Sequence, residues 1–577
     1  MGYTQFSFLL FLCFFLLSFS SSIPHPCRKD QSISLLNFKQ TFTTYPSDSH
    51  YCSYSHPKTS LWNVSRDCCS WDGVTCDEMT GHVIELDLSC SQLVGKIDSN
   101  SSLFQLSYLQ RLDLSYNNFS NSHISPEFGW FSSLTHLNIS ESSFSGQIPS
   151  EISRLSKLQS LLLYQYETNL RLTAHDFKFL IQNLTQLTEL DLSNVNICST
   201  IPLNFSSHLT TITMRGTGLY GIIPESIFNL PNLETLELSS NDQLSGYFPK
   251  PKWNSSASLI SLDLYNCNLS GPIAESLSNL TRLESLDLDG NTLNGTIPSG
   301  MLRFLYLRGN HFSGQLEDFK SNSLEYIDLS YNQLQGHLPK SIQNLVNLTV
   351  LYLSFNNSSG HVDVSLFSDL KHLSDLDLSY NSISLTNENK VNFTLPESLY
   401  TLRLAACGVK ELEFLRFAKH LEFLDLSNNK LQGRIPDWAW SNWMFSLQRL
   451  NLSHYMLTSV DSIPLLYVET IDLRSNLLQG SLPIPPNTTW LFSISQNNLS
   501  GEIIPSSICN LTSLEMLDLG RNNLRGGIPQ CLGNITTLTD LDMRHNNLSG
   551  NLPRAFSNGS SLRSLNLHGN KLEGKIP

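Results

Sequence analysis

The feature that most constrains this chain of 577 residues is a short leucine-bearing phrase that recurs along most of its length. Leu112–Asn117 reads Leu-Asp-Leu-Ser-Tyr-Asn, and Leu424–Asn429 repeats it with one change. The better copies continue into a second phrase, such as Leu431–Pro436, which reads Leu-Gln-Gly-Arg-Ile-Pro. About 21 copies follow one another at a spacing of about 24 residues. Aligned on the final Asn, they end at positions 91, 117, 142, 166, 195, 217, 241, 267, 291, 310, 332, 356, 381, 407, 429, 455, 476, 497, 522, 546 and 570. A repeat array therefore replaces the several globular domains that the length alone would suggest.

The residue types in the phrase predict a leucine-rich-repeat solenoid of α/β class, a horseshoe or superhelix with a parallel sheet on its concave side. Alternating leucines such as Leu112 and Leu114 point inward from a short strand, and Asp113 and Ser115 then point to the concave face. The amide of the final Asn both donates and accepts, so we expect it to satisfy backbone groups in the bend that no strand partner reaches. Cys267 and Cys407 take the place of this Asn in two repeats, and we expect both to be buried thiols.

The chain divides into a leader, a cap and the array. An apolar run from Phe6 to Phe19, followed by serines, predicts a secretory signal peptide over residues 1–22. Residues 23–82 have another composition and several cysteines, which predicts a disulfide-stapled cap on the first repeat. Residues 83–577 form the array, which ends within a phrase and without a second cap. An insertion around Leu170 to Phe179 and a shortened repeat between positions 291 and 310 are expected to change its curvature.

A secreted chain meets an oxidising compartment and the glycosylation machinery. No apolar run after the leader reaches the roughly 18 residues of a membrane helix, so the chain as written is expected to be secreted. Loss of Cys13 with the leader leaves an odd number of cysteines, so at least one thiol stays unpaired. N-glycosylation is expected at Asn63, Asn100, Asn118, Asn138, Asn183, Asn204, Asn268, Asn279, Asn347, Asn392, Asn510, Asn534 and Asn547. Chance triplets in an Asn-rich and Ser-rich repeat are the alternative for any single site.

Composition and motifs exclude several function classes. A net charge of −14 without a basic run argues against nucleic-acid binding. The segment Gly216–Gly221 has the spacing of a dinucleotide fingerprint, but the same residues fill the repeat's own slots and Pro224 prevents a helix from starting there. Zinc-protease, serine-hydrolase and kinase signatures are absent from the sequence. We therefore expect no enzyme, no metal and no cofactor.

The concave strand positions are the expected site of recognition because they have no role in the core. Aspartates recur there, which either reflects the usual residue of this repeat or forms a groove for cations; we favour the former. Their positions are Asp113, Asp191, Asp263, Asp287, Asp328, Asp377, Asp425, Asp472, Asp518 and Asp542. Positions where an aromatic or basic residue replaces the usual residue of the repeat are more informative, since Tyr, Trp and Arg dominate binding hot spots. They predict one ligand-binding patch on consecutive central repeats, made of Tyr265, Tyr306, Arg308, Tyr331, Tyr352 and Phe355. Tyrosine as a common filler of the repeat is the alternative.

The cap and the first repeats carry a family resemblance. Trp62 and the segment Asp67–Asp77 resemble the N-terminal cap of plant extracellular leucine-rich-repeat proteins, and the Gly-x-Ile-Pro phrase is similar to the plant version of the repeat. The segments Val83–Leu93 and Ser101–Leu106 are similar to the Cf-type disease-resistance receptor-like proteins. Such receptors sit in the plasma membrane facing the apoplast, perceive pathogen-derived proteins and signal through partner receptor kinases. This chain lacks the family's later repeats, island segment, membrane helix and tail, which indicates a truncated product or gene model.

The resemblance also implies disulfides. The family cap suggests the pairs Cys27 with Cys68 and Cys69 with Cys76, although sequence alone leaves the connectivity open. Cys52 and Cys90 remain for a third bridge. Cys509 and Cys531 lie nearly one repeat apart, which is close enough in a stacked solenoid to bridge neighbouring turns. Cys198, Cys267 and Cys407 are left over.

Two functions follow. The first is the recognition module of an immune receptor that binds a protein or peptide ligand, a pathogen effector among the candidates, with receptor-kinase co-receptors as partners of a full-length form. The alternative is a secreted inhibitor of pathogen cell-wall-degrading enzymes, similar to polygalacturonase inhibitors. Those inhibitors have about ten repeats and a C-terminal cysteine cap, so the repeat number here favours the receptor.

Overall fold

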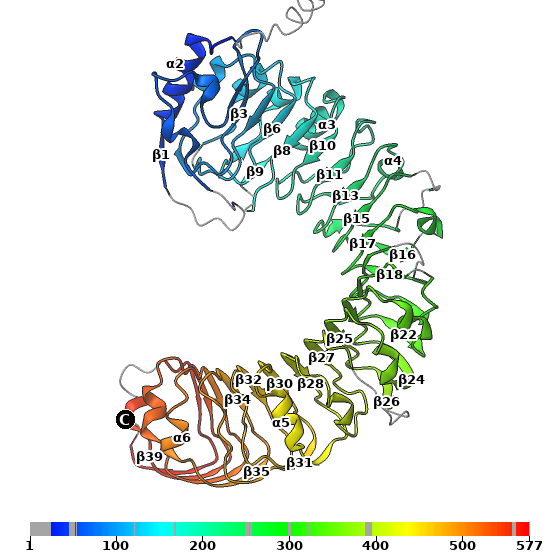
Figure 1. Cartoon of the computed structure of the whole chain (residues 1–577), viewed down its shortest axis with the longest axis vertical. Helices are drawn as coiled ribbons and strands as arrows, with labels where there is room; N and C mark the ends of the chain where they lie inside the picture. The colour runs from blue at the N-terminus through cyan, green and yellow to red at the C-terminus, as the bar shows by residue number, and fades with distance from the viewer. Residues whose placement is uncertain are drawn as a thin grey trace, which may run out of the picture. The chain divides into compact units, whose positions relative to one another are not determined.

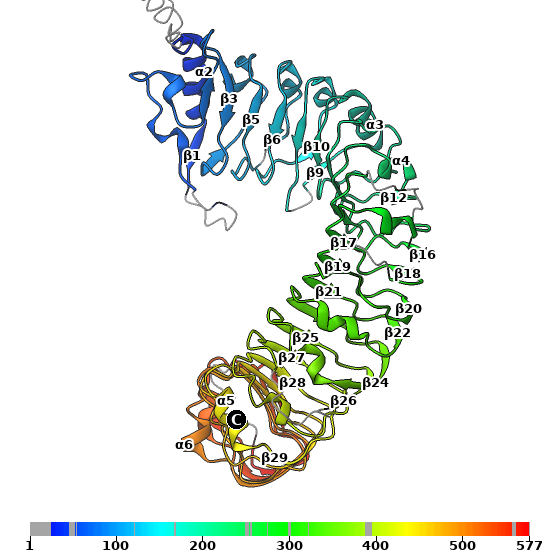
Figure 2. The same ribbon diagram turned by 45° about the vertical axis from the view of Figure 1, so that its right-hand side comes forward.

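The computed structural model describes residues 25–45, 52, 55–120, 122–166, 169–248, 253, 257–273, 275–297, 302–320, 322–386, 395–556 and 561–575. The leader and the sequon at Asn392 lie outside these residues. The chain forms two compact units, Met1–Asn268 and Leu269–Pro577. Each unit is a stack of repeats in which strands line one side and short helices or loops the other (Figure 1; Figure 2).

Unit 1 has a main sheet in which one strand of each repeat pairs in parallel with the next. Leu112 pairs with Leu86 on one side and with Leu137 on the other, so the inward leucines stay in register. Only the first strand, from the cap, is antiparallel to its neighbour. The strands are β2 (Val74–Cys76), β3 (Val83–Asp87), β5 (Arg111–Asp113), β6 (His136–Asn138), β8 (Ser160–Leu162), β10 (Glu189–Asp191), β11 (Thr211–Thr213), β13 (Thr235–Glu237) and β15 (Ser261–Asp263).

Smaller strands and helices complete unit 1 away from this sheet. The insertion expected around Leu170 to Phe179 forms β9 and the amphipathic helix α3, which buries Phe177, Leu180 and Ile181. The paired strands are β1 (Phe42–Thr44) with β4 (Leu93–Gly95), β7 (Gly146–Gln147) with β9 (Leu170–Arg171), and β12 (Tyr220–Gly221) with β14 (Gln243–Leu244). The helices are α2 (Lys29–Lys39), α3 (Ala174–Asn183), α4 (Glu225–Phe228) and the 3-10 helices η1 (Lys58–Leu61), η2 (Cys68–Ser70), η3 (Ser102–Gln105), η4 (Pro126–Trp130) and η5 (Ser150–Arg154).

Unit 2 repeats this plan with a longer sheet. All its main strands pair in parallel, as Leu305 does with Leu286 and with Ile327. The strands are β17 (Ser285–Asp287), β19 (Phe304–Tyr306), β21 (Tyr326–Asp328), β23 (Val350–Tyr352), β25 (Asp375–Asp377), β27 (Thr401–Arg403), β28 (Phe423–Asp425), β30 (Arg449–Asn451), β32 (Thr470–Asp472), β34 (Leu491–Ser493), β36 (Met516–Asp518), β38 (Asp540–Asp542) and β40 (Ser564–Asn566).

The Gly-x-Ile-Pro phrases of unit 2 add short parallel ladders beside the main sheet. They are β16 (Ser270–Pro272) with β18 (Thr292–Asn294); β20 (Ser313–Gln315), β22 (Gln333–Gly336), β24 (Asn357–Asp363) and β26 (Ser382–Thr386); β29 (Gln432–Arg434) with β31 (Met456–Ser459); and β33 (Gln479–Gly480), β35 (Asn498–Glu502), β37 (Asn523–Gly526), β39 (Asn547–Asn551) and β41 (Lys571–Glu573). The helices are α5 (Asp437–Trp443), α6 (Pro505–Ile508), η6 (Glu275–Asn279), η7 (Lys340–Asn344), η8 (Val364–Phe367), η9 (Glu413–Leu415), η10 (Gln530–Asn534) and η11 (Arg554–Phe556).

The interior consists of leucine columns closed by an asparagine ladder. Leu112 and Leu114 are fully buried, and each such side chain contributes roughly 1.5–3 kcal/mol to folding. The amide of Asn117 donates to the carbonyl oxygens of Leu88, Leu114 and Ser115 and accepts from the backbone N–H of Leu93. The role predicted for this residue is therefore confirmed, and so is the solenoid fold.

Two details of the sequence alignment are wrong. The alignment places a ladder residue at position 166, but Gln165 fills that role. Gln165 is buried and donates to the carbonyl oxygen of Ile139, while Tyr166 is 80 % exposed. Ser115 does not point into solvent either. It is buried, and its hydroxyl donates to the carboxylate of Asp113. At Ser115 the slot after the second leucine therefore belongs to the bend.

Candidate functional site

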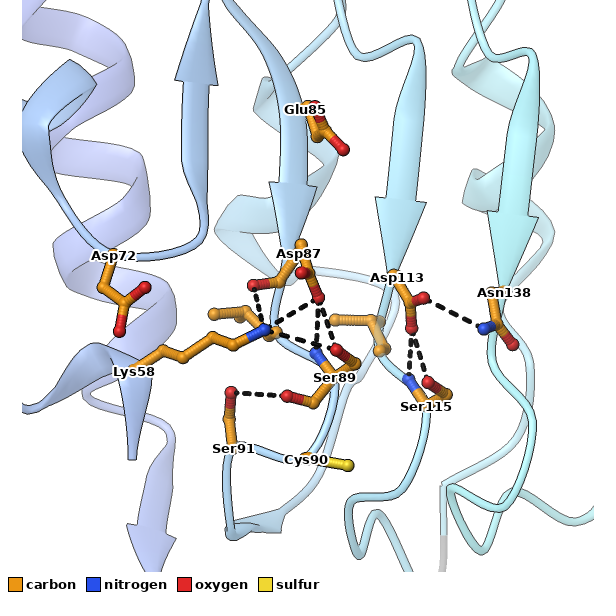
Figure 3. A network of polar contacts seen from close by, with 12 residues as sticks. Lys58, Asp72, Glu85, Asp87, Ser89, Cys90, Ser91, Asp113, Ser115 and Asn138 are labelled. Carbon is orange, nitrogen blue, oxygen red and sulfur yellow. Dashed lines mark hydrogen bonds and ion pairs between the residues drawn. The ribbon is translucent and has the colours of Figure 1, made fainter. Parts of the chain in front are cut away.

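The exposed side of the main sheet is organised first by its aspartates. Asp113 accepts hydrogen bonds from the backbone N–H and the hydroxyl of Ser115, at 2.9 Å and 2.6 Å, and its other oxygen accepts from Asn138 at 2.9 Å (Figure 3). The same bond to the backbone N–H two residues later recurs at Asp191, Asp263, Asp287, Asp328, Asp377, Asp425, Asp472, Asp518 and Asp542. The aspartate column therefore holds the strand-ending bends, which favours the structural interpretation over a cation groove.

The cap is fastened to the first repeat through one of these bends. The ammonium group of Lys58 lies 2.9 Å from Asp87 Oδ1 and donates to Ser89 Oγ at 3.2 Å (Figure 3). Burial tends to raise the pKa of Asp87, but the hydrogen bonds from Ser89 and Lys58 outweigh it and hold the pKa below its ordinary value. The cap and the array thus share a charged contact at the start of the sheet.

A polar hollow of about 240 Å³ lies on the same face of unit 1, over β3, β5, β6, β8 and β10. Its charged groups already have partners: Arg111 lies 3.3 Å from Glu85, and Ser160 donates to Glu189 at 2.6 Å. Burial, with Arg111 nearby, lowers the pKa of His136. Because these charged groups are already paired with protein groups, the hollow is a weak candidate for a ligand site.

Unit 2 carries a column of stacked aromatic rings, formed by Tyr331, Phe355 and Tyr380, which we call the aromatic ladder. The ring centroids of Tyr331 and Phe355 are 4.3 Å apart with planes 13° from parallel, and those of Phe355 and Tyr380 are 4.5 Å apart at 19°. The three side chains are 46 %, 39 % and 42 % exposed. Each precedes the ladder Asn of its repeat and has a positive φ, between 54° and 56°. Rings of this size left open to solvent in a row are available to a partner.

A second set of rings lies on the strands themselves. Tyr306, Tyr326 and Tyr352 form what we call the tyrosine row, with centroid distances of 4.6 Å between the first two and 6.1 Å between the last two. These side chains are half-buried. Burial, with nearby carboxylates, raises the pKa of Tyr306 and Tyr352 above the ordinary value, so both hydroxyls stay protonated donors at physiological pH.

Two arginines lie over aromatic rings of this surface. The guanidinium carbon of Arg308 is 5.1 Å from the centroid of Tyr331, and that of Arg403 is 4.5 Å from Phe423 and 5.9 Å from Tyr352. Such cation–π contacts contribute about 0.5–2 kcal/mol. The surface thus places positive charges beside exposed aromatic rings.

The structure places five of the six residues predicted for the patch on neighbouring repeats of unit 2: Tyr306 and Tyr352 lie in strands, and Arg308, Tyr331 and Phe355 lie in the bends that follow β19, β21 and β23. Tyr265, which is 40 % exposed, belongs to unit 1, so its membership stays a prediction. Sequence reasoning missed Tyr326, Tyr380 and Arg403. Tyr380 occupies the same slot as Tyr331 and Phe355, and a comparison of that slot across repeats would have found it.

The cysteines and sequons are placed as follows. Disulfides join Cys27 to Cys68, Cys52 to Cys90, Cys69 to Cys76 and Cys509 to Cys531, the pairs set out from the sequence. Four cap sulfurs lie close enough together for a metal, but both bridges consume the thiolates a metal needs. Cys267 and Cys407 are buried thiols, and Cys198 is exposed. Of the described sequon asparagines, Asn138 and Asn183 are half-buried and the others are exposed.

Comparisons with known proteins agree with this architecture. The family model of the leucine-rich-repeat N-terminal domain matches residues 28–77, and the leucine-rich-repeat model matches residues 108–131, 133–155, 258–280, 282–301, 323–345, 420–442, 513–535, 537–558 and 561–577. Receptor-like protein Cf-9 of Solanum pimpinellifolium is 55 % identical over 258 residues, which is 43 % of this chain and 30 % of that protein. Receptor-like protein 7 of Arabidopsis thaliana is 37 % identical over 90 % of this chain and 61 % of its own length.

The chain belongs to the plant leucine-rich-repeat receptor-like proteins of the Cf type. It spans less than two thirds of the length of these relatives. Among solved structures, this receptor-like protein is similar to the Arabidopsis receptor kinase HAESA in complex with the peptide hormone IDA and the co-receptor SERK1. The TM-score is 0.61 at 27 % identity, covering 95 % of each chain.

This kinship agrees with the prediction that the receptor-like protein is not an enzyme, because the matching proteins are receptor-like proteins and a receptor ectodomain. Within the described residues, no helix has both the length and the apolar character needed to cross a bilayer.

Proposed function

We propose that this chain is the extracellular recognition module of a plant immune receptor, which binds a pathogen-derived or apoplastic peptide or protein through the exposed face of its main sheet. The observation that carries the proposal is the aromatic ladder. Three large rings stand partly open to solvent, whereas the aspartates of the neighbouring strands are tied into bends. Clusters of exposed aromatic and arginine side chains are typical hot spots of protein recognition.

Two similarities support the proposal. The relatives are receptor-like proteins, and the resemblance to the Cf type implies perception of pathogen proteins at the plasma membrane. The HAESA structure holds a peptide hormone and a co-receptor, which favours a peptide or protein ligand and a receptor-kinase partner here as well. The pathogen origin of the ligand rests on the Cf resemblance alone.

The test is capture from apoplastic fluid. The purified chain is immobilised, exposed to fluid from infected and healthy leaves, and the retained peptides and proteins are identified by mass spectrometry. We expect ligands enriched by infection, retained by the wild type and lost from a variant that carries Tyr331→Asn and Phe355→Asn. Retention that is the same for both proteins would contradict recognition through this face. Retention of a pectin-degrading enzyme with loss of its activity would favour the inhibitor instead.

A further inference from the structure

Arg308 and Arg403 differ from the other arginine of the same strands. Arg303 is neutralised by Glu325 at 2.7 Å and by Glu284 at 3.4 Å. All three guanidinium groups lie over aromatic rings. Among the described residues, however, Arg308 and Arg403 have no carboxylate oxygen within ion-pair distance of their guanidinium nitrogens. Arg403 also shares a side-chain hydrogen bond with Tyr352. A guanidinium group has five N–H donors, so donors remain in the fork that matches a carboxylate.

Asp289 and Asp328 both interact electrostatically with Arg308. Asp289 occupies the slot that holds Ser330 or Ser379 in later repeats, and its carboxylate accepts from the backbone N–H of Arg308 at 2.5 Å. Burial, with Asp287 next to it, raises the pKa of Asp289 to about 8. The carboxyl group is therefore mostly protonated at the acidic to neutral pH of an extracellular fluid, and the guanidinium group keeps its net charge.

The aromatic ladder limits what can lie between the arginines. The faces of its rings are covered by one another, because neighbouring planes are only 13° to 19° from parallel at 4.3 Å to 4.5 Å. A sugar ring needs an aromatic face to stack on, whereas ring edges and tyrosine hydroxyls suit aliphatic side chains, aromatic faces and peptide carbonyl groups. This arrangement favours a polypeptide over a glycan.

The distance between the arginines suits an extended segment. Arg308 follows β19 and Arg403 ends β27, with β21, β23 and β25 between them in the sheet. Four strand steps of about 4.8 Å make roughly 19 Å, which an extended peptide of about six residues spans. Strands β17 to β28 carry no asparagine, and therefore no sequon, at their exposed positions; Asn451 on β30 is the first.

We propose that this surface binds an extended peptide whose acidic side chains pair with Arg308 and Arg403 and whose apolar side chains lie against the edges of the aromatic ladder. The inference rests on the proposed recognition function and names the chemistry of its ligand. The carboxylates are those of Asp or Glu side chains within the segment.

The probe is an array of peptides about eight residues long, acetylated and amidated so that no terminal charge remains. The array varies the number and spacing of acidic and apolar residues. We expect the wild type to retain peptides with two acidic residues about six positions apart around an apolar centre, and retention to fall as salt is raised. Arg308→Gln and Arg403→Gln should each weaken the best peptide about 10-fold, as loss of a charge-assisted pair does. Each variant should also lose the preference for an acidic residue at one end of the peptide and keep it at the other end.

Arg416→Gln is the matched control. Arg416 also stacks on a ring, that of Trp438 at 4.9 Å, but it follows η9 on the side of the repeat away from the sheet. Its loss should leave binding unchanged, and melting curves of all variants report folding. Retention without acidic preference, or only of peptides with a free C-terminal carboxylate, would overturn the inference. If the chain captures apoplastic ligands but shows no acidic preference on the array, only this inference fails. If it captures neither apoplastic ligands nor array peptides, the proposed function fails as well.

Discussion

The ring of Tyr331 lies 4.3 Å from the ring of Phe355 and nearly parallel to it, although the two residues stand one repeat apart in the sequence. The cause is the solenoid itself. Equivalent slots of successive repeats lie one strand spacing of about 4.8 Å apart, and this slot is held at φ near 55° by the bend that precedes the ladder Asn. Aromatic residues that recur in this slot must therefore stack.

The first prediction concerns the ladder side chains. Asparagine tolerates a positive φ, as Asn194, Asn266 and Asn428 do in the same chain. Tyr331→Asn with Phe355→Asn should therefore lower the free energy of unfolding by only about 1 kcal/mol, because the two residues remain 46 % and 39 % exposed. Binding of a captured ligand should fall at least about 10-fold, as for a hot-spot truncation. Melting curves and surface plasmon resonance measure the two effects.

Tyr380 needs a different substitution. Tyr380→Asn would create an Asn-Asn-Ser sequon. Tyr380→His avoids this, and histidine adopts a positive φ in the same slot at His454 and His545. We expect weaker ligand binding with unchanged melting for this variant too. A large drop in melting temperature with unaltered affinity would show that the ladder serves the fold alone.

The second prediction concerns the asparagine ladder. Asn429 donates to the carbonyl oxygens of Leu404, Leu426 and Ser427 and accepts from two backbone N–H groups. Asn429→Ala leaves these buried groups without partners, so we expect a loss of about 2–4 kcal/mol. Lys430→Ala, which changes an exposed side chain beside it, should cost less than about 0.5 kcal/mol. Equal losses in chemical denaturation would contradict the role of the ladder.

The fold can be predicted from the sequence because the residues that recur with the repeat period are also the residues that form the core. Leu112, Leu114 and Asn117 each have a single task that recurs, so one phrase determines strand, core and bend together. The exposed face is less predictable. Tyr326 and Arg403 join the site only through strand register, which a linear sequence does not display. Gln165 shows a further limit: an irregular repeat moves the ladder function to a neighbouring residue, and only the hydrogen bond to Ile139 reveals it.

The third prediction concerns the docking of the cap. Gly73 has φ +78°, and a Cβ added there would stand 2.1 Å from the carbonyl oxygen of Asp87. Gly73→Ala should therefore displace the cap from the first repeat and cost about 3 kcal/mol or more, as steric strain in a packed contact does. Gly433→Ala is the control: its φ is +83°, but nothing lies within 4 Å of the added carbon. It should cost only about 1 kcal/mol, the price of the backbone conformation. Limited proteolysis of the cap would distinguish the two variants.

The last prediction concerns pH and Asp289. Burial and the neighbouring Asp287 raise the pKa of Asp289 from its ordinary value of 3.8 to about 8. The folded state therefore holds this proton more strongly than the unfolded state between these values, so its contribution to stability is full at low pH and is lost as pH rises through 8. Asp289→Ser, which restores the residue of most other repeats, removes this titration. Between pH 5 and pH 8.5 the melting temperature should fall less for Asp289→Ser than for the wild type. At pH 8.5 the corresponding difference in the free energy of unfolding should be on the order of 1 kcal/mol after solvent screening. Asp318→Ser, an exposed carboxylate in the same unit, should follow the wild-type curve. Parallel curves for all three proteins would mean that Asp289 is ionised in the folded state, and Arg308 would then face a charged neighbour.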